Sequence, residues 1–425
     1  MGIFFGTDGI RGIVGEDLSY SLALKCGNAI AQLKSSCKVL IGRDTRTSGQ
    51  MLAKSVSLGL ILGGADVTDI GIATTPSISY LTRALGYDFG VVISASHNPA
   101  EYNGIKIFDI SGQKISDKQE TYIEKLIVHT LNIDYSKIGK YSYKPSILNK
   151  YIDFVCGVGV NLTGLNIGID CSNGASKYIA KKIFKKLGAT VHFIGMGGGK
   201  NINNKCGATY PQKIAKFVNK NKLDYGFCFD GDADRIVMVG PTGEIFTGDN
   251  ILYCLANYKL LPNNNVIVGT ALSNLGLEYA LKQKNIKLER ADVGDKYVIE
   301  KMAQLGTNIG GEQSGHIIVS NLLPTGDGVL TAVLLSGIIQ KNNPSKYMSF
   351  KAYPQVMLNV ATSDKLRVMG SEDLAKAINY ATEELAGNGR VFVRPSGTEN
   401  KIRIMVEAIN QQKAQALANY IASKI

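Results

Sequence analysis

The stretch Val39-Leu-Ile-Gly-Arg-Asp-Thr-Arg-Thr-Ser-Gly49 has a plan that recurs twice further along the chain. An apolar run reaches a glycine, a short polar loop follows, and a helical pattern begins after it. The plan returns at Leu165-Asn-Ile-Gly-Ile-Asp-Cys-Ser-Asn-Gly174 and at Val266-Ile-Val-Gly-Thr-Ala-Leu-Ser-Asn-Leu-Gly276. Each copy leads to a second strand signal, and this alternation is typical of βαβ units. The repeat therefore predicts three similar α/β domains.

Each repeat also contains a later apolar strand that ends in a polar loop. These strands cover residues 90–93, 225–229 and 307–310, and the loops are Ser94-Ala-Ser-His-Asn-Pro99, Asp230-Gly-Asp-Ala-Asp-Arg235 and Gly311-Glu-Gln-Ser-Gly-His316. In open α/β sheets, ligands bind beyond the carboxyl ends of the strands. The three loops hold equivalent positions, so we expect them to converge on one central cleft.

The repeat stops at about residue 352. Beyond it, alternating segments at 355–361, 389–393 and 401–407 and helical stretches near 371–386 and 410–424 indicate a smaller α+β domain. The prediction is an α/β protein of three similar domains with mixed sheets and a C-terminal α+β domain, arranged around a central cleft. The predicted boundaries are 1–148, 149–248, 249–352 and 353–425.

Composition limits the classes of protein that fit. With 425 residues, 45% hydrophobic and 19% charged, the chain is globular and too long for a single ordinary core. Its seven cysteines are scattered without a CxxC spacing, which argues against a disulfide framework or a zinc site and favours a reducing cytoplasm. No apolar run approaches the roughly 18 residues of a membrane span. The net charge of +12 is dispersed, which favours an anionic small substrate or a lysine-rich surface over nucleic acid.

The second loop carries three carboxylates within five residues, Asp230, Asp232 and Asp234. Their mutual repulsion requires a cation or basic partners nearby. An EF-hand is excluded, because Arg235 and Pro241 stand where that loop needs Gly and Glu. Three carboxylate oxygens suit Mg²⁺, which keeps open positions for a phosphate oxygen. The alternative is an acidic surface loop.

The first loop presents a hydroxyl and an imidazole, those of Ser96 and His97, just after a strand. The alternative is an ordinary strand exit in which a serine caps backbone groups. Lys106 follows on the returning segment and can reach the same pocket as an acid/base or as a charge on a phosphoryl group; otherwise it is a surface lysine. Arg11 lies in a glycine-rich opening segment and faces a ligand, or else belongs to a surface turn.

Two further groups suit the binding of a sugar phosphate. Glu312, Ser314 and His316 offer donors and acceptors for sugar hydroxyls or an amine, although a lone histidine is more often structural. The second group gathers a fork-shaped cation, two hydroxyls and a glycine, as a phosphate monoester needs: Arg394, Ser396, Gly397 and Thr398, with Arg403 beyond. A presented serine, a metal loop, a polyol loop and a phosphate clamp together indicate phosphoryl transfer on a phosphosugar.

The four loops, with Arg394-Pro-Ser-Gly-Thr-Glu399 as the last, resemble the α-D-phosphohexomutase superfamily over essentially the whole chain. The opening Phe5-Gly-Thr-Asp-Gly-Ile-Arg-Gly12, Gln313 and Thr325-Gly-Asp-Gly328 most resemble its bacterial phosphoglucosamine mutase branch. The resemblance implies that Ser96 carries a phosphoryl group and that Mg²⁺ is held by the serine phosphate with the three aspartates. It also implies that Arg235 and Lys106 assist transfer, and we count His97 and Arg11 with them as catalytic candidates.

The implied reaction converts glucosamine 6-phosphate to glucosamine 1-phosphate through glucosamine 1,6-bisphosphate, towards UDP-N-acetylglucosamine. The resemblance further implies a glucosamine or glucose 1,6-bisphosphate activator, no nucleic-acid or membrane partner, and a homodimer as one option. The chain departs from the family pattern at Lys296, at Asn400 and at Leu323-Pro324, which bears on substrate specificity. The alternatives are a phosphomannomutase/phosphoglucomutase of the same superfamily and a non-catalytic phosphosugar- or nucleic-acid-binding protein.

Overall fold

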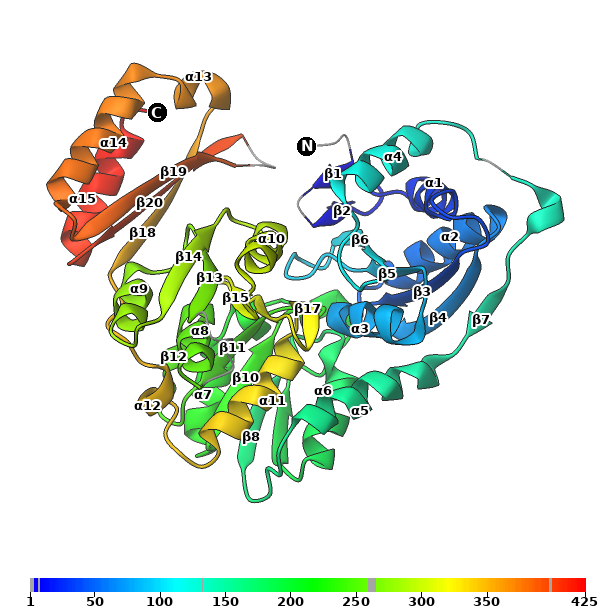
Figure 1. Ribbon diagram of the computed structural model, residues 1–425, viewed down its shortest axis with the longest axis horizontal. Helices are drawn as coiled ribbons and strands as arrows, with labels where there is room; N and C mark the ends of the chain where they lie inside the picture. Colours follow the sequence, from blue (N-terminus) through cyan, green and yellow to red (C-terminus); the bar gives the residue numbers. More distant parts are fainter. Residues whose placement is uncertain (1–3, 7, 132, 259–264, 397–399) are drawn as a thin grey trace.

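The computed structural model describes residues 4–6, 8–131, 133–258, 265–396 and 400–425, which form four sheets, one in each domain (Figure 1). Domain 1 (blue to cyan) and domain 4 (orange to red) lie on either side of the view, and domains 2 and 3 lie below them. The predicted fold class is confirmed: three α/β domains with mixed sheets and a small C-terminal α+β domain surround a common centre.

Domain 1 has a seven-stranded mixed sheet in the order β1-β2-β6-β5-β3-β4-β7. Helices cover both of its faces, so β5 is buried along its whole length. Val91 and Ile93 face one cluster of apolar side chains and Val92 faces the other, as the two-residue period of a strand requires. The strands are β1 (Phe5–Gly6), β2 (Gly9–Ile13), β3 (Lys38–Arg43), β4 (Asp66–Ile72), β5 (Phe89–Ile93), β6 (Tyr102–Asp109) and β7 (Tyr141–Tyr143), and the helices are α1 (Tyr20–Ala31), α2 (Gly49–Leu62), α3 (Thr75–Leu85) and α4 (Asp117–Ile127).

Domain 2 repeats this plan. Its first strand, β8, lies between β9 and β10 with both pairs parallel, just as β3 lies between β4 and β5. The third strand then pairs with an antiparallel return strand, β11 here and β6 in domain 1. The elements are α5 (Leu148–Val158), β8 (Asn166–Asp170), α6 (Ser176–Lys186), β9 (Thr190–Ile194), α7 (Gln212–Lys220), β10 (Tyr225–Phe229), β11 (Ile236–Val239) and β12 (Ile245–Phe246).

Domain 3 has the same topology, with β13 between β14 and β15 and with β16 as the antiparallel return strand. The strand predicted over 307–310 is observed as β15, two residues later. The elements are α8 (Gly248–Asn257), β13 (Val266–Thr270), α9 (Leu275–Lys282), β14 (Lys287–Ala291), α10 (Asp295–Leu305), β15 (Ile309–Gly311), β16 (Ile317–Val319), β17 (Leu323–Gly326), α11 (Gly328–Ile339) and α12 (Ser345–Met348). The threefold repeat read from the sequence is therefore a repeat of sheet topology.

Domain 4 has a three-stranded antiparallel sheet in the order β18-β20-β19. Its apolar side chains form their own cluster, whereas the largest cluster of the molecule is shared by domains 1, 2 and 3. The elements are β18 (Gln355–Ala361), α13 (Lys365–Met369), α14 (Glu372–Leu385), β19 (Gly389–Pro395), β20 (Lys401–Ala408) and α15 (Gln411–Ala422). Within the described part of the chain, no helix has the length and apolar character needed to cross a membrane.

Candidate active site

The serine loop follows β5 and is held by buried hydrogen bonds. Ser96 is 1% exposed and has a left-handed backbone, with φ +51°. Its N–H donates to Ser94 Oγ at 2.9 Å, and the Ser94 hydroxyl donates to Asp44 Oδ2 at 2.7 Å. The Ser96 hydroxyl donates to Asp230 Oδ2 at 2.5 Å and lies 3.4 Å from Asp234 Oδ1. The loop therefore presents the Ser96 hydroxyl directly to the aspartate loop of domain 2.

The aspartate loop connects β10 to β11 and is almost completely buried. One carboxylate oxygen from each of Asp230, Asp232 and Asp234 lies within 4.8 Å of the others. Thr75, at the start of α3, donates its hydroxyl to Asp232 Oδ2 at 2.5 Å, while Asp232 Oδ1 is buried without a hydrogen-bond partner. Three clustered carboxylates with an unpaired buried oxygen fit a divalent cation.

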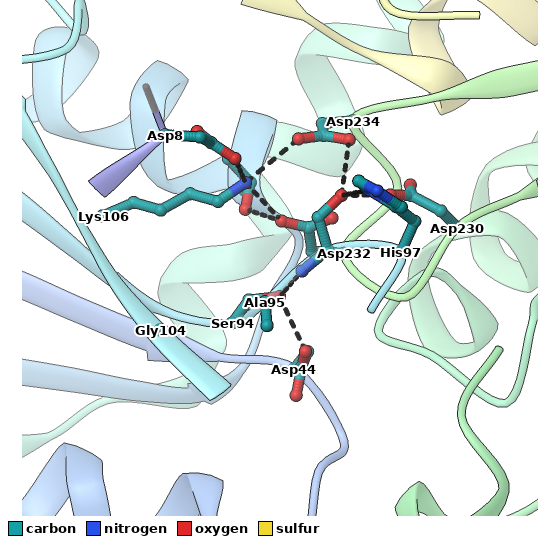
Figure 2. A network of polar contacts seen from close by, with 12 residues as sticks. Asp8, Asp44, Ser94, Ala95, His97, Gly104, Lys106, Asp230, Asp232 and Asp234 are labelled. Atoms are coloured by element: carbon teal, nitrogen blue, oxygen red, sulfur yellow. Dashed lines mark hydrogen bonds and ion pairs between the residues drawn. The ribbon is translucent and has the colours of Figure 1, made fainter. Parts of the chain in front are cut away.

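Lys106 points from β6 into this cluster (Figure 2). Its Nζ lies 2.9 Å from Asp232 Oδ2, 3.1 Å from Asp234 Oδ2 and 3.0 Å from Asp8 Oδ2, and its side chain is 1% exposed. Burial by itself lowers the pKa of Lys106, but the three carboxylates outweigh it and hold that pKa well above the usual value. Lys106 is therefore charged, which favours the charge role over the acid/base role and rules out a surface lysine.

The two carboxyl groups beside the Ser96 hydroxyl, those of Asp230 and Asp234, have pKa values shifted in opposite directions. Burial, together with the charges of Asp234 and Asp232, raises the pKa of Asp230 well above its ordinary value. Burial also raises the pKa of Asp234, but Lys106 and His316 outweigh it and the net pKa is lowered. Of these two carboxylates, Asp230 is the one that accepts the Ser96 hydroxyl proton in its shorter hydrogen bond.

Arg11 and His97 flank the serine loop. Arg11 Nη1 donates to Asn98 Oδ1 at 2.8 Å, and its Nη2 pairs with Asp8. His97 Nδ1 lies 3.3 Å from Ser96 Oγ. Burial and the neighbouring Arg235 and Arg11 lower the pKa of His97 to about 3, so the imidazole is neutral at pH 7.

Arg235, the last residue of the aspartate loop, is half-buried. Its backbone N–H donates to Asp230 Oδ1 at 3.2 Å, and its Nε is buried without a hydrogen-bond partner. An unpaired guanidinium donor beside the serine loop suits an anionic ligand.

The third loop, residues 311–316, has an exposed part at Ser314 and a buried part at His316. Glu312 Oε1 accepts from the N–H of Gly294 at 3.0 Å, and its Oε2 accepts from the exposed Ser314 hydroxyl at 2.9 Å. His316 is 5% exposed; its Nε2 accepts from the N–H of Gly326 at 3.1 Å and its Nδ1 lies 4.0 Å from Asp234. One ring nitrogen of His316 thus contacts backbone and the other lies near the aspartate loop, and the predicted contact of His316 with the sugar stays a prediction.

Domain 4 brings two arginines together. Arg394 on β19 lies directly opposite Arg403 on β20. Burial and then the charge of Arg403 lower the pKa of Arg394. Like charges directly opposite one another are destabilising, and a bound anion offsets this. Ser396 is buried beside them, whereas Gly397 and Thr398 lie outside the described residues.

Comparisons with known proteins identify the family of this chain. Family models described as phosphoglucomutase/phosphomannomutase alpha/beta/alpha domains I, II and III and the C-terminal domain match residues 2–133, 149–243, 247–354 and 357–424. Curated phosphoglucosamine mutases from Staphylococcus aureus strains Newman and JH9 are each 41% identical over 100% of this chain and 98% of their own length. The chain belongs to the α-D-phosphohexomutase superfamily.

Solved phosphohexomutase structures share the fold. A phosphoglucomutase/phosphomannomutase family protein from Burkholderia thailandensis has a TM-score of 0.85 at 22% identity, covering 99% of this chain and 96% of its own. The N-acetylphosphoglucosamine mutase of Aspergillus fumigatus, in complex with GlcNAc-6P and magnesium, has a TM-score of 0.68 at 16% identity, covering 99% and 95%. The resemblance inferred from the four loops is thus confirmed.

The structure also places residues in this phosphohexomutase site that the sequence analysis did not single out. Asp8 pairs with Lys106 and with Lys114, and the Lys114 Nζ lies 2.7 Å from Asp295 Oδ2. Arg46, 1% exposed, pairs with Asp44 and donates to backbone carbonyls of the serine loop. Asp44 and Arg46 lie in the first repeat, directly after β3, so their position at a strand end was the available signal.

Proposed function

We propose that this phosphohexomutase interconverts glucosamine 6-phosphate and glucosamine 1-phosphate through a phosphorylated Ser96 and a glucosamine 1,6-bisphosphate. The observation that carries the proposal is the Ser96 hydroxyl, 2.5 Å from Asp230 and next to the carboxylate cluster that contains Lys106. The choice of the amino sugar is supported by the full-length similarity to curated phosphoglucosamine mutases. The product is a precursor on the route to UDP-N-acetylglucosamine.

Ser96 is the proposed phosphoryl carrier. Its hydroxyl proton lies in a hydrogen bond to Asp230 Oδ2, so that carboxylate is placed to receive the proton when Ser96 attacks a phosphate of the bisphosphate. The bond from Ser96 Oγ to phosphorus would form as the bond from that phosphorus to the sugar oxygen breaks, and the sugar oxygen would take up one proton to become a hydroxyl. The charged Lys106 and Arg235 lie where they balance negative charge on the transferring group. His97 is neutral and stays close to Ser96 Oγ, and Arg11 fixes the loop through Asn98.

Asp230, Asp232 and Asp234, completed by phosphorylated Ser96, would hold the proposed Mg²⁺. The fit rests on the clustered oxygens and on the unpaired Asp232 Oδ1. When bound, the cation neutralises charge that develops on the phosphoryl oxygens. Lys106 adds positive charge to the same cluster through its contacts with Asp232 and Asp234.

The remaining part of the substrate would be held by domains 3 and 4. Glu312, Ser314 and His316 are proposed to contact the sugar, and Arg394, Ser396, Gly397, Thr398 and Arg403 are proposed to contact the phosphate that does not react. Support comes from the open position of Ser314 and from the two facing arginines. His316 Nδ1 also lies 4.0 Å from Asp234 Oδ1, which places the imidazole beside the aspartate loop.

Further expectations from the sequence stay predictions. They are the domain boundaries 1–148, 149–248, 249–352 and 353–425, a glucosamine or glucose 1,6-bisphosphate activator, a cytoplasmic location, the absence of nucleic-acid partners, and a homodimer as one option.

The proposal is tested by following interconversion with ³¹P NMR, using the purified protein, Mg²⁺ and a trace of glucose 1,6-bisphosphate. Glucosamine 6-phosphate, glucose 6-phosphate and mannose 6-phosphate are compared. We expect kcat/KM for the amino sugar to exceed the others by about tenfold or more. A preference for a plain hexose phosphate would support the phosphomannomutase/phosphoglucomutase alternative. Failure with all three sugars, together with salt-sensitive DNA binding, would support a non-catalytic protein.

A further inference from the structure

The carbonyl oxygen of Ser96 is held by two different domains. Arg46 Nη2, from domain 1, donates to it at 3.0 Å and to Asn98 O at 2.8 Å. Asn203 Nδ2, from domain 2, donates to the same two carbonyl oxygens at 2.8 and 2.9 Å. Arg46 belongs to the same domain as the serine loop, so it fixes the loop only within domain 1. Asn203 ties the loop to the domain that carries the aspartates.

The amide of Asn203 is oriented by its own domain. Ser172 Oγ donates to Asn203 Oδ1 at 2.8 Å, and the N–H of Asn203 donates to Ser172 O at 3.1 Å. With Oδ1 used as an acceptor, Nδ2 must point towards the serine loop. Asn203 has φ +58°, a left-handed conformation that asparagine tolerates better than most residues. Contacts within domain 2 therefore fix the orientation of the Asn203 side chain, independently of the serine loop.

The surrounding backbone leaves little room for the loop to move. A Cβ on Gly231, in the aspartate loop, would lie 2.7 Å from Ser96 O. A Cβ on Gly199, in the segment that leads to Asn203, would lie 1.7 Å from Thr45 O of domain 1. Both glycines permit a close approach of domain 2 backbone to domain 1 backbone. Ser96 O is thus enclosed by Arg46, Asn203 and Gly231.

We propose that Asn203 is a positioning residue that fixes the phosphoryl-carrying serine loop against the aspartate loop across the interface of domains 1 and 2. This inference rests on the proposed function. Asn203 does not touch Ser96 Oγ or any carboxylate of the cluster in the contacts that define the site, so it acts through the Ser96 backbone. Its loss displaces the hydroxyl from Asp230 while leaving the three aspartates in place.

The test uses Asn203→Asp and Asn203→Gly in the full-length protein. Asn203→Asp keeps the acceptor for Ser172 but turns a carboxylate towards two carbonyl oxygens. Asn203→Gly keeps the left-handed backbone and removes the side chain without adding charge. The matched control is Asn204→Asp, which adds the same charge at the neighbouring exposed residue. Single-turnover transfer between phosphorylated Ser96 and glucosamine 6-phosphate, steady-state kcat and KM, melting temperature and Mg²⁺ affinity by calorimetry are measured for each.

We expect both Asn203 variants to lower kcat and the transfer rate by about 10- to 100-fold, as misplacement of a reacting group by about 1 Å does. KM and the Mg²⁺ affinity of the unphosphorylated protein stay close to those of the wild type. The melting temperature of both Asn203 variants falls, because hydrogen bonds between domains 1 and 2 are lost, and rates are compared well below it. Asn204→Asp behaves as the wild type. Wild-type transfer rates in both Asn203 variants would overturn the proposal. A loss of Mg²⁺ affinity in unphosphorylated Asn203→Gly as large as its loss of transfer rate would also overturn the proposal, because the residue would then act on the aspartate loop. If the wild type itself transfers no phosphoryl group, the proposed function fails instead.

Discussion

Lys106 balances the buried carboxylates of the site. It is 1% exposed and contacts Asp8, Asp232 and Asp234 at once. A buried ion network is costly to leave incomplete, because removing one partner leaves an uncompensated charge in a poorly solvated place. Two of these carboxylates, Asp232 and Asp234, are also among those proposed for Mg²⁺, so the lysine and the cation contribute positive charge to one cluster.

The change Lys106→Met is expected to lower the free energy of unfolding by about 3–5 kcal/mol when no divalent cation is present. Added Mg²⁺ should restore part of that loss and should stabilise the variant more than the wild type. Thermal melting with and without Mg²⁺ measures both effects. Lys118→Met, at an exposed position on α4, is the control. Equal stabilisation of the wild type and Lys106→Met by Mg²⁺ would show that the lysine does not compensate the proposed metal site.

At the scale of the elements, helix α11 begins at a titratable cap. Asp327 accepts from the N–H of Leu330 at 3.0 Å and from the Tyr151 hydroxyl at 2.7 Å. The helix is buried nearly all round, and burial raises the pKa of Asp327 to about 6 from an ordinary 3.8. Because the folded-state pKa is raised, the stability that Asp327 contributes is full below pH 3.8 and is lost as the pH rises through 6.

Asp327→Asn keeps an oxygen for Leu330 but does not ionise. Relative to this variant, the wild type should lose stability between pH 4 and pH 7, by at most about 1.4 kcal/mol per pH unit. Urea unfolding across this range measures the difference. Asp364→Asn, at the exposed cap of α13, should give curves parallel to the wild type. Parallel curves for Asp327→Asn would show that the cap does not titrate in this range.

The elements also show which parts of the site could be predicted. The positions of the strand-end loops were predictable. Ser96 and Asp230 follow apolar strands in the sequence, and residues that follow a strand lie at the edge of the sheet. Asn203 was not predictable, because its partners are backbone carbonyls that come close only after domains 1 and 2 pack. For Arg46 the only signal was its place directly after a strand. The contact of His316 with the sugar stays a prediction, because a loop position does not reveal which way a side chain points. The contact between Ser96 and Asp230 agrees with the prediction that equivalent loops of the repeats converge, because the two residues lie on equivalent loops of the first and second repeats.

At the scale of the whole molecule, domain 4 stands apart from the other three. Its apolar cluster is separate, while domains 1, 2 and 3 share one. The proposed site thus combines Ser96 and the aspartates, which lie in domains 1 and 2, with Arg394 and Arg403 on domain 4. A mutase transfers a phosphoryl group at either end of one sugar, so the bisphosphate must turn round between steps. The account therefore predicts that the proposed phosphate clamp on domain 4 serves both orientations.

Arg394→Ala should therefore weaken transition-state stabilisation by about 2–4 kcal/mol, the range for a lost charged partner in a desolvated contact. The loss should be similar for the 6-phosphate and the 1-phosphate. Exchange of label out of phosphorylated Ser96 is measured with each monophosphate separately, with Arg367→Ala on the exposed face of α13 as the control. A variant that fails in one orientation and is near normal in the other would indicate two separate clamps.

The central claim, that Ser96 carries the phosphoryl group, is tested most directly by intact-mass and peptide mass spectrometry. The protein is incubated with Mg²⁺ and isotopically labelled glucose 1,6-bisphosphate and is then chased with unlabelled glucosamine 6-phosphate. The account predicts one labelled phosphate on Ser96 that leaves during the chase, and neither label nor turnover in Ser96→Ala. Label on another residue, or turnover by Ser96→Ala within about tenfold of the wild type, would contradict it.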